Sequence, residues 1–115
     1  MDHNLVLHID SARDDVLRLL LRNAENYLAA LPGEKFELAV VANGPGVTQF
    51  RGELGELGER AKALAAQGVK FRMCANALRE KSVAPESLWP FCEIVPAGLV
   101  ELVRLQKEGF AYVKP

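Results

Sequence analysis

Cysteine is scarce in this chain, and long apolar runs are missing. Two cysteines cannot form a disulfide scaffold, and alone they are too few ligands for a structural zinc site. No uninterrupted apolar stretch approaches the roughly 18 residues that suggest a membrane span. The start of the sequence also lacks the positive segment and the longer apolar segment of a secretory signal. We therefore expect a cytoplasmic protein with reduced thiols and no membrane partner.

An excess of either charge is also missing. The 14 basic and 15 acidic residues give a formal net charge of −1 and are interspersed. A nucleic-acid binder would show a basic stripe, so we expect no nucleic-acid partner. The residue types suggest neither a metal site nor a cofactor motif. The 115 residues, half of them hydrophobic, suit one soluble domain over residues 1–115.

Short β-like runs alternate with helical segments along the chain. We expect strands over residues 4–9, 36–42, 69–73, 93–95 and 110–113. We expect helices from an N-cap at Ser11 to Leu31, over about 53–67, near 76–80 and over 99–107. This alternation with short connections predicts an α/β fold: a mostly parallel sheet of about five strands, with helices on both faces.

The last expected helix is apolar around more than one stripe. The apolar residues in it are Leu99, Val100, Leu102, Val103 and Leu105. A helix of this kind is buried on more than its sheet side. Either another subunit covers the outer side, or the loop at residues 89–91 does.

Ligands in open parallel sheets bind at the carboxyl ends of the strands, which selects a short set of candidates. The set is Asp10, residues 43–46, residues 74–76 and residues 96–98, with His8 just inside the first strand's end. Cys74 is the strongest candidate among them. Backbone N–H groups of the following turn would lower the pKa of its thiol and favour the nucleophilic thiolate. Position alone is equally consistent with a small buried hydrophobe.

The other candidates each have an ordinary structural interpretation. Cys92 follows Trp89-Pro90-Phe91, and these apolar surroundings favour an inert thiol over a resolving partner for Cys74. His8 is either a hydrogen-bonded core residue or a group that stabilises a thiolate. The turn Asn43-Gly44-Pro45-Gly46 is either a tight turn or an anion site, and it lacks the Gly-Lys-Ser/Thr ending of a phosphate-binding loop.

Several segments together resemble the DsrE/DsrF-like family. They are Leu7-His8-Ile9, residues 23–28, 41–47 and 68–78, Val95-Pro96-Ala97-Gly98, and the ending 106–115. They cover nearly the whole chain in order. The most specific parts are the pattern Gly-Val-x-Phe-x-x-Cys-x-Asn-x-Leu, which begins at Gly68, and the Val-Pro-x-Gly segment.

The resemblance implies a flavodoxin-like sheet that assembles into homo-oligomers, commonly trimers or hexamers. It also implies a cysteine that carries sulfur as a persulfide, and Cys74 matches that strand-end position. Residues His8, Asn43 and Asn76 fall on recurring family positions. The expected substrate-binding residues are His8, Asn43, Gly44, Asn76, Pro96 and Gly98.

Three functions are compatible with these residues. In the first, Cys74 relays sulfane sulfur between donor and acceptor proteins, as a possible sulfurtransferase. In the second, the strand ends form a non-catalytic binding module for a small anion or a nucleotide. In the third, the protein is an oligomeric scaffold. The variant Cys74→Ser separates them, because sulfur loading vanishes under the first function whereas ligand binding survives under the second.

Overall fold

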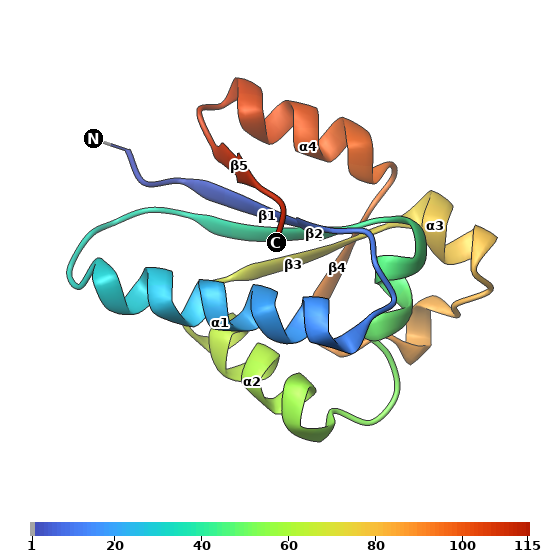
Figure 1. Ribbon diagram of the computed structural model, residues 1–115. Coiled ribbons are helices and arrows are strands. Elements are labelled where there is room, and N and C mark those ends of the chain that lie inside the picture. The colour runs from blue at the N-terminus through green and yellow to red at the C-terminus, as the bar shows by residue number, and fades with distance from the viewer. Residues whose placement is uncertain (1) are drawn as a thin grey trace.

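A computed structural model describes residues 2–115 (Figure 1). Its strands are β1 (Leu5–Ile9), β2 (Leu38–Ala42), β3 (Lys70–Cys74), β4 (Cys92–Val95) and β5 (Ala111–Val113). Its α-helices are α1 (Asp14–Ala30), α2 (Gly55–Ala66), α3 (Ala75–Glu80) and α4 (Gly98–Lys107). Two 3₁₀ helices, η1 (Gly44–Gln49) and η2 (Pro85–Ser87), complete the described elements. None of the described helices is long and apolar enough to span a membrane.

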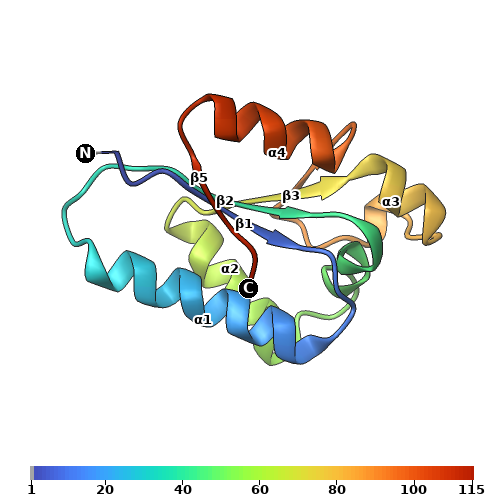
Figure 2. The ribbon, with the colours of Figure 1, turned by 45° about the horizontal axis from the view of Figure 1, so that its top comes forward.

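The sheet has five strands in the order β4-β3-β2-β1-β5, and every neighbouring pair is parallel. Helices α1 and α2 cover one face, and α4 covers the other (Figures 1 and 2). The chain steps outward from β1 to β4, and α4 then returns across the sheet to place β5 beside β1. The predicted three-layer, flavodoxin-like α/β architecture is therefore confirmed.

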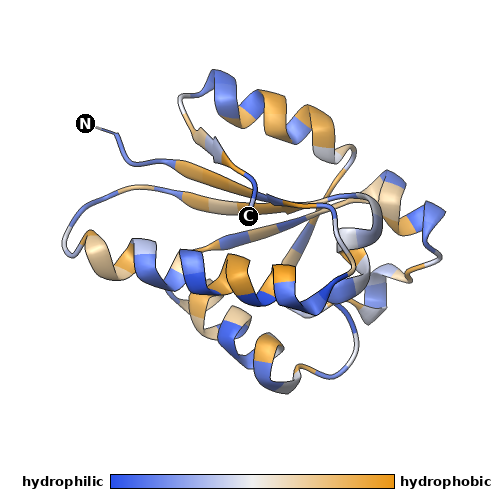
Figure 3. Ribbon diagram, viewed as in Figure 1, coloured by the Kyte–Doolittle hydropathy of each residue, from blue (hydrophilic) through white to orange (hydrophobic). Residues whose placement is uncertain are grey.

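Two hydrophobic cores lie on the two faces of the sheet. The larger one, between the sheet and helices α1 and α2, is built on residues such as Leu7, Val40 and Phe71. The smaller one, under α4, consists of Val6, Ala39, Val41, Leu102, Leu105 and Phe110. Strands buried on both faces are apolar along most of their length, as Figure 3 shows. Within the sheet, polar side chains are therefore few in β1 and β2, whereas β3 carries Lys70 and Arg72.

Two local predictions differ from the structure. The Oγ atom of Ser11 accepts a hydrogen bond from the amide of Arg13 (3.0 Å), and α1 begins only at Asp14 with Arg13 as its N-cap. Ser11 therefore closes a turn ahead of the helix, so its prediction as N-cap was wrong. The segment after Asn43 is a six-residue 3₁₀ helix and not a short tight turn, because Gly46 and Val47 pack into the core.

The outer side of α4 is not covered by the loop at residues 89–91. Trp89 stacks edge-on against Phe50, and Phe91 against Phe71, each with ring centroids 5.4 Å apart. These contacts place the loop with the core of α1 and α2, on the opposite face of the sheet. The loop alternative was therefore wrong, and Leu99, Val100 and Val103 remain exposed.

Candidate functional site

Cys74 is the last residue of β3 and the N-cap of α3, so the strand passes into the helix without a loop. The residue is buried, with 6% of its surface exposed. Strand β2 lies next to β3 and ends beside Asn43, which is the N-cap of η1. The two side chains thus stand at the carboxyl edge of the sheet on adjacent strands.

The start of α4 closes over this pair. A Cβ atom added to Gly98 would lie 3.1 Å from the Cβ atoms of both Asn43 and Cys74, and 3.6 Å from the Sγ of Cys74. The absence of a side chain at Gly98 therefore lets the first turn of α4 rest directly beside the sulfur. The N-terminus of a helix carries a partial positive charge, and that of α4 begins at Gly98.

His8 links Asn43 to the far edge of the sheet. Its Nε2 lies 2.8 Å from the Oδ1 of Asn43, and its Nδ1 lies 2.5 Å from the hydroxyl of Tyr112. The imidazole is buried. Tyr112 belongs to β5, which pairs with β1 so that Val6 faces Tyr112 in register. Three neighbouring strands thus contribute one polar chain that reaches Asn43.

For three predicted site residues, the structure gives no contact with the Cys74 sulfur. Asn76 is exposed on α3, and its Oδ1 accepts a hydrogen bond from Arg79. Gly44 turns against the end of β1, where an added Cβ would lie 3.8 Å from the carbonyl oxygen of Asp10. Pro96 is exposed in the connection from β4 to α4. The structure therefore groups Cys74 with Gly98, Asn43 and His8.

The DsrE/DsrF-like family model matches residues 10–115. The chain belongs to this family. DsrE/DsrF-like proteins are generally associated with sulfur relay. Comparison with curated proteins finds no match.

Two solved structures of similar size have the same fold. The protein of unknown function MTH1491 from Methanobacterium thermoautotrophicum is 34% identical, with a TM-score of 0.90 over 99% of this chain and 100% of that one. The ychN protein from E. coli is 19% identical, with a TM-score of 0.71 over 98% of this chain and 99% of that one. The second likeness shows the fold alone.

Cys92 is not placed to act on Cys74 in this DsrE/DsrF-like chain. Cys92 pairs in register with Phe71, whereas Cys74 pairs with Val95, so the two cysteines are three positions apart on opposite faces of the sheet. Three residues of strand span about 10 Å, too far for a disulfide. Burial also raises the pKa of the Cys92 thiol to about 12. Its interpretation as an inert structural residue is the one that the geometry supports.

Four cavities in the described residues 2–115 lie away from the sulfur. They have volumes of about 80 to 580 Å³, and none of them is lined by Cys74, Asn43 or Gly98. No group of three or more His, Cys, Asp and Glu side chains in the described residues is arranged to hold a metal ion. The sulfur itself has little contact with solvent, because Cys74 is only 6% exposed.

Tyr112 is the site residue that sequence reasoning missed. The run 110–113 was expected as a strand, but its neighbour in the sheet depends on the crossover through α4. Only the position of β5 beside β1 brings the phenol to His8. The alternation of Ala111, Tyr112 and Val113 was the one available signal, because it places Tyr112 alone on the face that α4 covers.

Proposed function

We propose that this protein relays sulfur as a persulfide carried on Cys74, in the reducing cytoplasm, between a donor and an acceptor protein. One observation carries the proposal: the thiol lies at the carboxyl end of β3, where a Cβ atom added to Gly98, the first residue of α4, would lie 3.6 Å from Sγ. The general association of the DsrE/DsrF-like family with sulfur relay supports it.

The chemistry needs one thiolate and no redox partner. The Cys74 thiolate attacks the outer sulfur of a donor persulfide, R–S–SH, and forms a new S–S bond to Sγ. The donor S–S bond breaks, and its electron pair leaves on the donor as the thiolate R–S⁻. An acceptor thiolate then attacks the outer sulfur of Cys74–S–SH and releases the Cys74 thiolate. Both steps are thiol–disulfide exchanges, whose rates depend on thiolate fraction and access.

The surroundings of the sulfur suit a negative charge. By helix geometry, the N–H groups of residues 98–100 have no partner within α4, and their dipoles add to the positive end of the helix. This end lies near the sulfur, because a Cβ atom added to Gly98 would be 3.6 Å from Sγ. The low exposure of Cys74 limits the access of bulky reagents to its sulfur. A donor must therefore present its terminal sulfur at the carboxyl edge of the sheet.

The test is sulfur loading measured by intact-mass spectrometry. The protein is incubated with glutathione persulfide, and the added sulfur is mapped by peptide analysis. We expect one added sulfur on Cys74 in the wild type, none in Cys74→Ser, and normal loading in the matched control Cys92→Ser. Sulfur on Cys92, or no added sulfur on the folded wild type, contradicts the proposal. The remaining functions would then be the non-catalytic binding module and the oligomeric scaffold.

A further inference from the structure

An unbroken hydrogen-bonded chain crosses three strands and ends beside Cys74. It runs from Tyr112 on β5 through His8 on β1 to Asn43, which follows β2. The two contacts of 2.5 and 2.8 Å lie at or below the usual lengths for such bonds. The described residues show no hydrogen bond from the phenol or the imidazole to the sulfur, so these two groups act on it through Asn43.

The chemistry of the three side chains sets the direction of the chain. The Oδ1 of Asn43 can only accept, so the Nε2 of His8 carries the hydrogen and donates it. A neutral imidazole protonated at Nε2 has a lone pair on Nδ1, which accepts the hydrogen of the Tyr112 hydroxyl. The hydrogen bonds therefore all point the same way, from Tyr112 toward Asn43.

This direction fixes the two ends of the Asn43 amide. Its oxygen is held toward β1, where His8 lies. Its nitrogen is consequently turned away from β1, and β3 with Cys74 lies on that other side of β2. The side chains of Asn43 and Cys74 are close to each other, because the Cβ atom of each lies 3.1 Å from the position that a Cβ atom on Gly98 would take. No hydrogen bond in the described residues uses the amide nitrogen of Asn43.

We propose that Tyr112 and His8 are positioning residues, which hold Asn43 so that its amide nitrogen donates a hydrogen bond to the anionic outer sulfur of the Cys74 persulfide. This inference rests on the proposed sulfur relay and names the residues that orient its product. Without the phenol, a neutral imidazole exchanges its proton between the two nitrogens. The amide of Asn43 then turns its nitrogen to an unprotonated Nε2, and the donor to the sulfur is lost.

The first measurement reads the proton position on His8 directly. Long-range ¹H–¹⁵N spectra distinguish a protonated Nε2 from a protonated Nδ1, and His3, the other histidine, serves as an internal reference. We expect Nε2 protonated and Nδ1 accepting in the wild type, and mixed tautomers in Tyr112→Phe. The matched control is Tyr27→Phe, which removes the other phenol and its bond to the His3 carbonyl (2.7 Å). It should leave His8 unchanged.

The second measurement follows loading from glutathione persulfide. We expect Tyr112→Phe to load about 2- to 10-fold more slowly, the factor that corresponds to one lost hydrogen bond. Asn43→Ala should load at least as slowly, and the double variant no more slowly than Asn43→Ala alone, because the phenol acts through the amide. A merely structural role of Tyr112 would instead add to the effect of Asn43→Ala.

The outcomes separate the two proposals. A folded wild type that takes up no sulfur overturns the sulfur relay, and this inference falls with it. A wild type that loads normally, together with an Nδ1-protonated His8 or a Tyr112→Phe variant that loads like Tyr27→Phe, overturns the positioning chain alone and leaves the relay intact.

Discussion

At the scale of the residue, Gly46 and Gly98 decide how closely other elements approach the sheet edge. A Cβ atom on Gly46 would lie 2.5 Å from the carbonyl oxygen of Ile9 and 2.9 Å from its carbon. These neighbours are backbone atoms at the end of β1, which cannot turn aside as a side chain does. Gly46 thus permits η1 to pack directly on the strand that carries His8.

Gly46→Ala should therefore lower the free energy of unfolding by about 3 kcal/mol, in the upper part of the range that overpacking costs. Urea denaturation measures the change. The control is Gly33→Ala, whose added methyl meets nothing within 4 Å. Gly33 has a φ of +77°, so its substitution should cost about 1 kcal/mol from backbone strain alone. Equal losses in the two variants would contradict the steric argument.

Gly98→Ala tests the contact with the sulfur. The added methyl would meet side-chain atoms of Asn43 and Cys74 at 3.1 Å, a distance that small shifts relieve. We expect a change in stability of about 1 kcal/mol or less, because Ala also favours the helix. Persulfide loading should fall more strongly, since the methyl fills space beside Sγ. Unchanged loading in a stable variant would show that the donor sulfur does not use this space.

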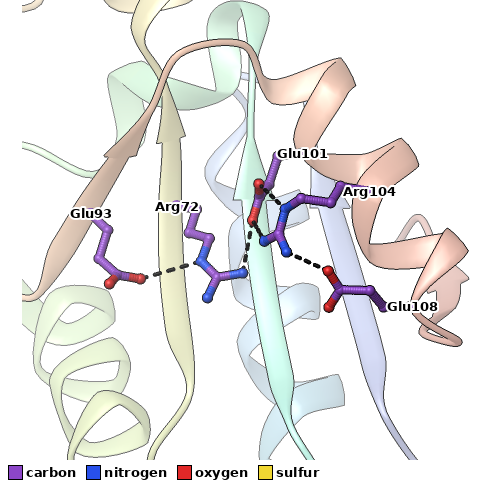
Figure 4. A network of polar contacts seen from close by, with 5 residues as sticks. All are labelled: Arg72, Glu93, Glu101, Arg104 and Glu108. Carbon is purple, nitrogen blue, oxygen red and sulfur yellow. Dashed lines mark hydrogen bonds and ion pairs between the residues drawn. The ribbon is translucent and has the colours of Figure 1, made fainter.

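At the scale of the element, a set of ion pairs fastens α4 to β3, as Figure 4 shows. Glu101, in the first turn of α4, has a side chain only 9% exposed. It accepts hydrogen bonds from Arg72 (2.8 Å) and Arg104 (2.6 Å). Arg72 precedes Cys74 by two residues on β3 and lies on the same face of the strand. The pairing therefore helps to hold the start of α4 over the sulfur.

This network predicts how stability depends on pH. Hydrogen bonding and charge attraction from Arg104, with a further contribution from Arg72, hold the pKa of Glu101 below its ordinary value. The stabilisation is fully present above the unfolded pKa of about 4.3 and is lost as pH falls through the lower folded pKa. Glu101→Gln should cost about 1–2 kcal/mol near neutral pH, with the difference from the wild type shrinking in acid.

The matched control for this network is Glu108→Gln. Glu108 pairs with Arg104 at 2.6 Å, but its side chain is half exposed. Such surface pairs contribute between 0 and about 1 kcal/mol. Denaturation series at several pH values should separate the two variants. A loss for Glu108→Gln as large as that for Glu101→Gln would show that α4 is not fastened through its first turn.

Sequence patterns could predict elements but not the contacts between distant ones. The apolar run Leu38–Ala42 predicts a buried strand because burial on both faces needs apolar residues at successive positions. Cys74 was placed at a strand end by the same reasoning. The contact of His8 with Tyr112 and that of Arg72 with Glu101 depend instead on α4 crossing back over the sheet, which sets β5 beside β1. No local periodicity encodes that crossing.

At the scale of the whole molecule, α4 presents two apolar sides. Leu102 and Leu105 are buried against the sheet, whereas Leu99 and Val100 are each 67% exposed and Val103 is partly exposed as well. Covering these side chains would remove apolar surface from water at about 25 cal/mol per Å². A small domain gains much from such burial. We therefore propose that the outer side of α4 is the interface of a homo-oligomer, for which the resemblance to the DsrE/DsrF-like family implies a trimer or a hexamer.

Val100→Lys should dissociate that oligomer, since an ammonium group in an apolar interface loses its hydration without gaining a partner. Sedimentation velocity on the full chain measures the assembly state, with an oligomer expected for the wild type and a monomer for the variant. The control is Leu19→Lys on α1, at a leucine 49% exposed on the opposite layer. A monomeric wild type, or an oligomer that survives Val100→Lys, contradicts the proposal. Because both variants add the same charge at an exposed apolar position, dissociation by Val100→Lys alone would assign the interface to α4, the helix that begins beside Cys74 at Gly98.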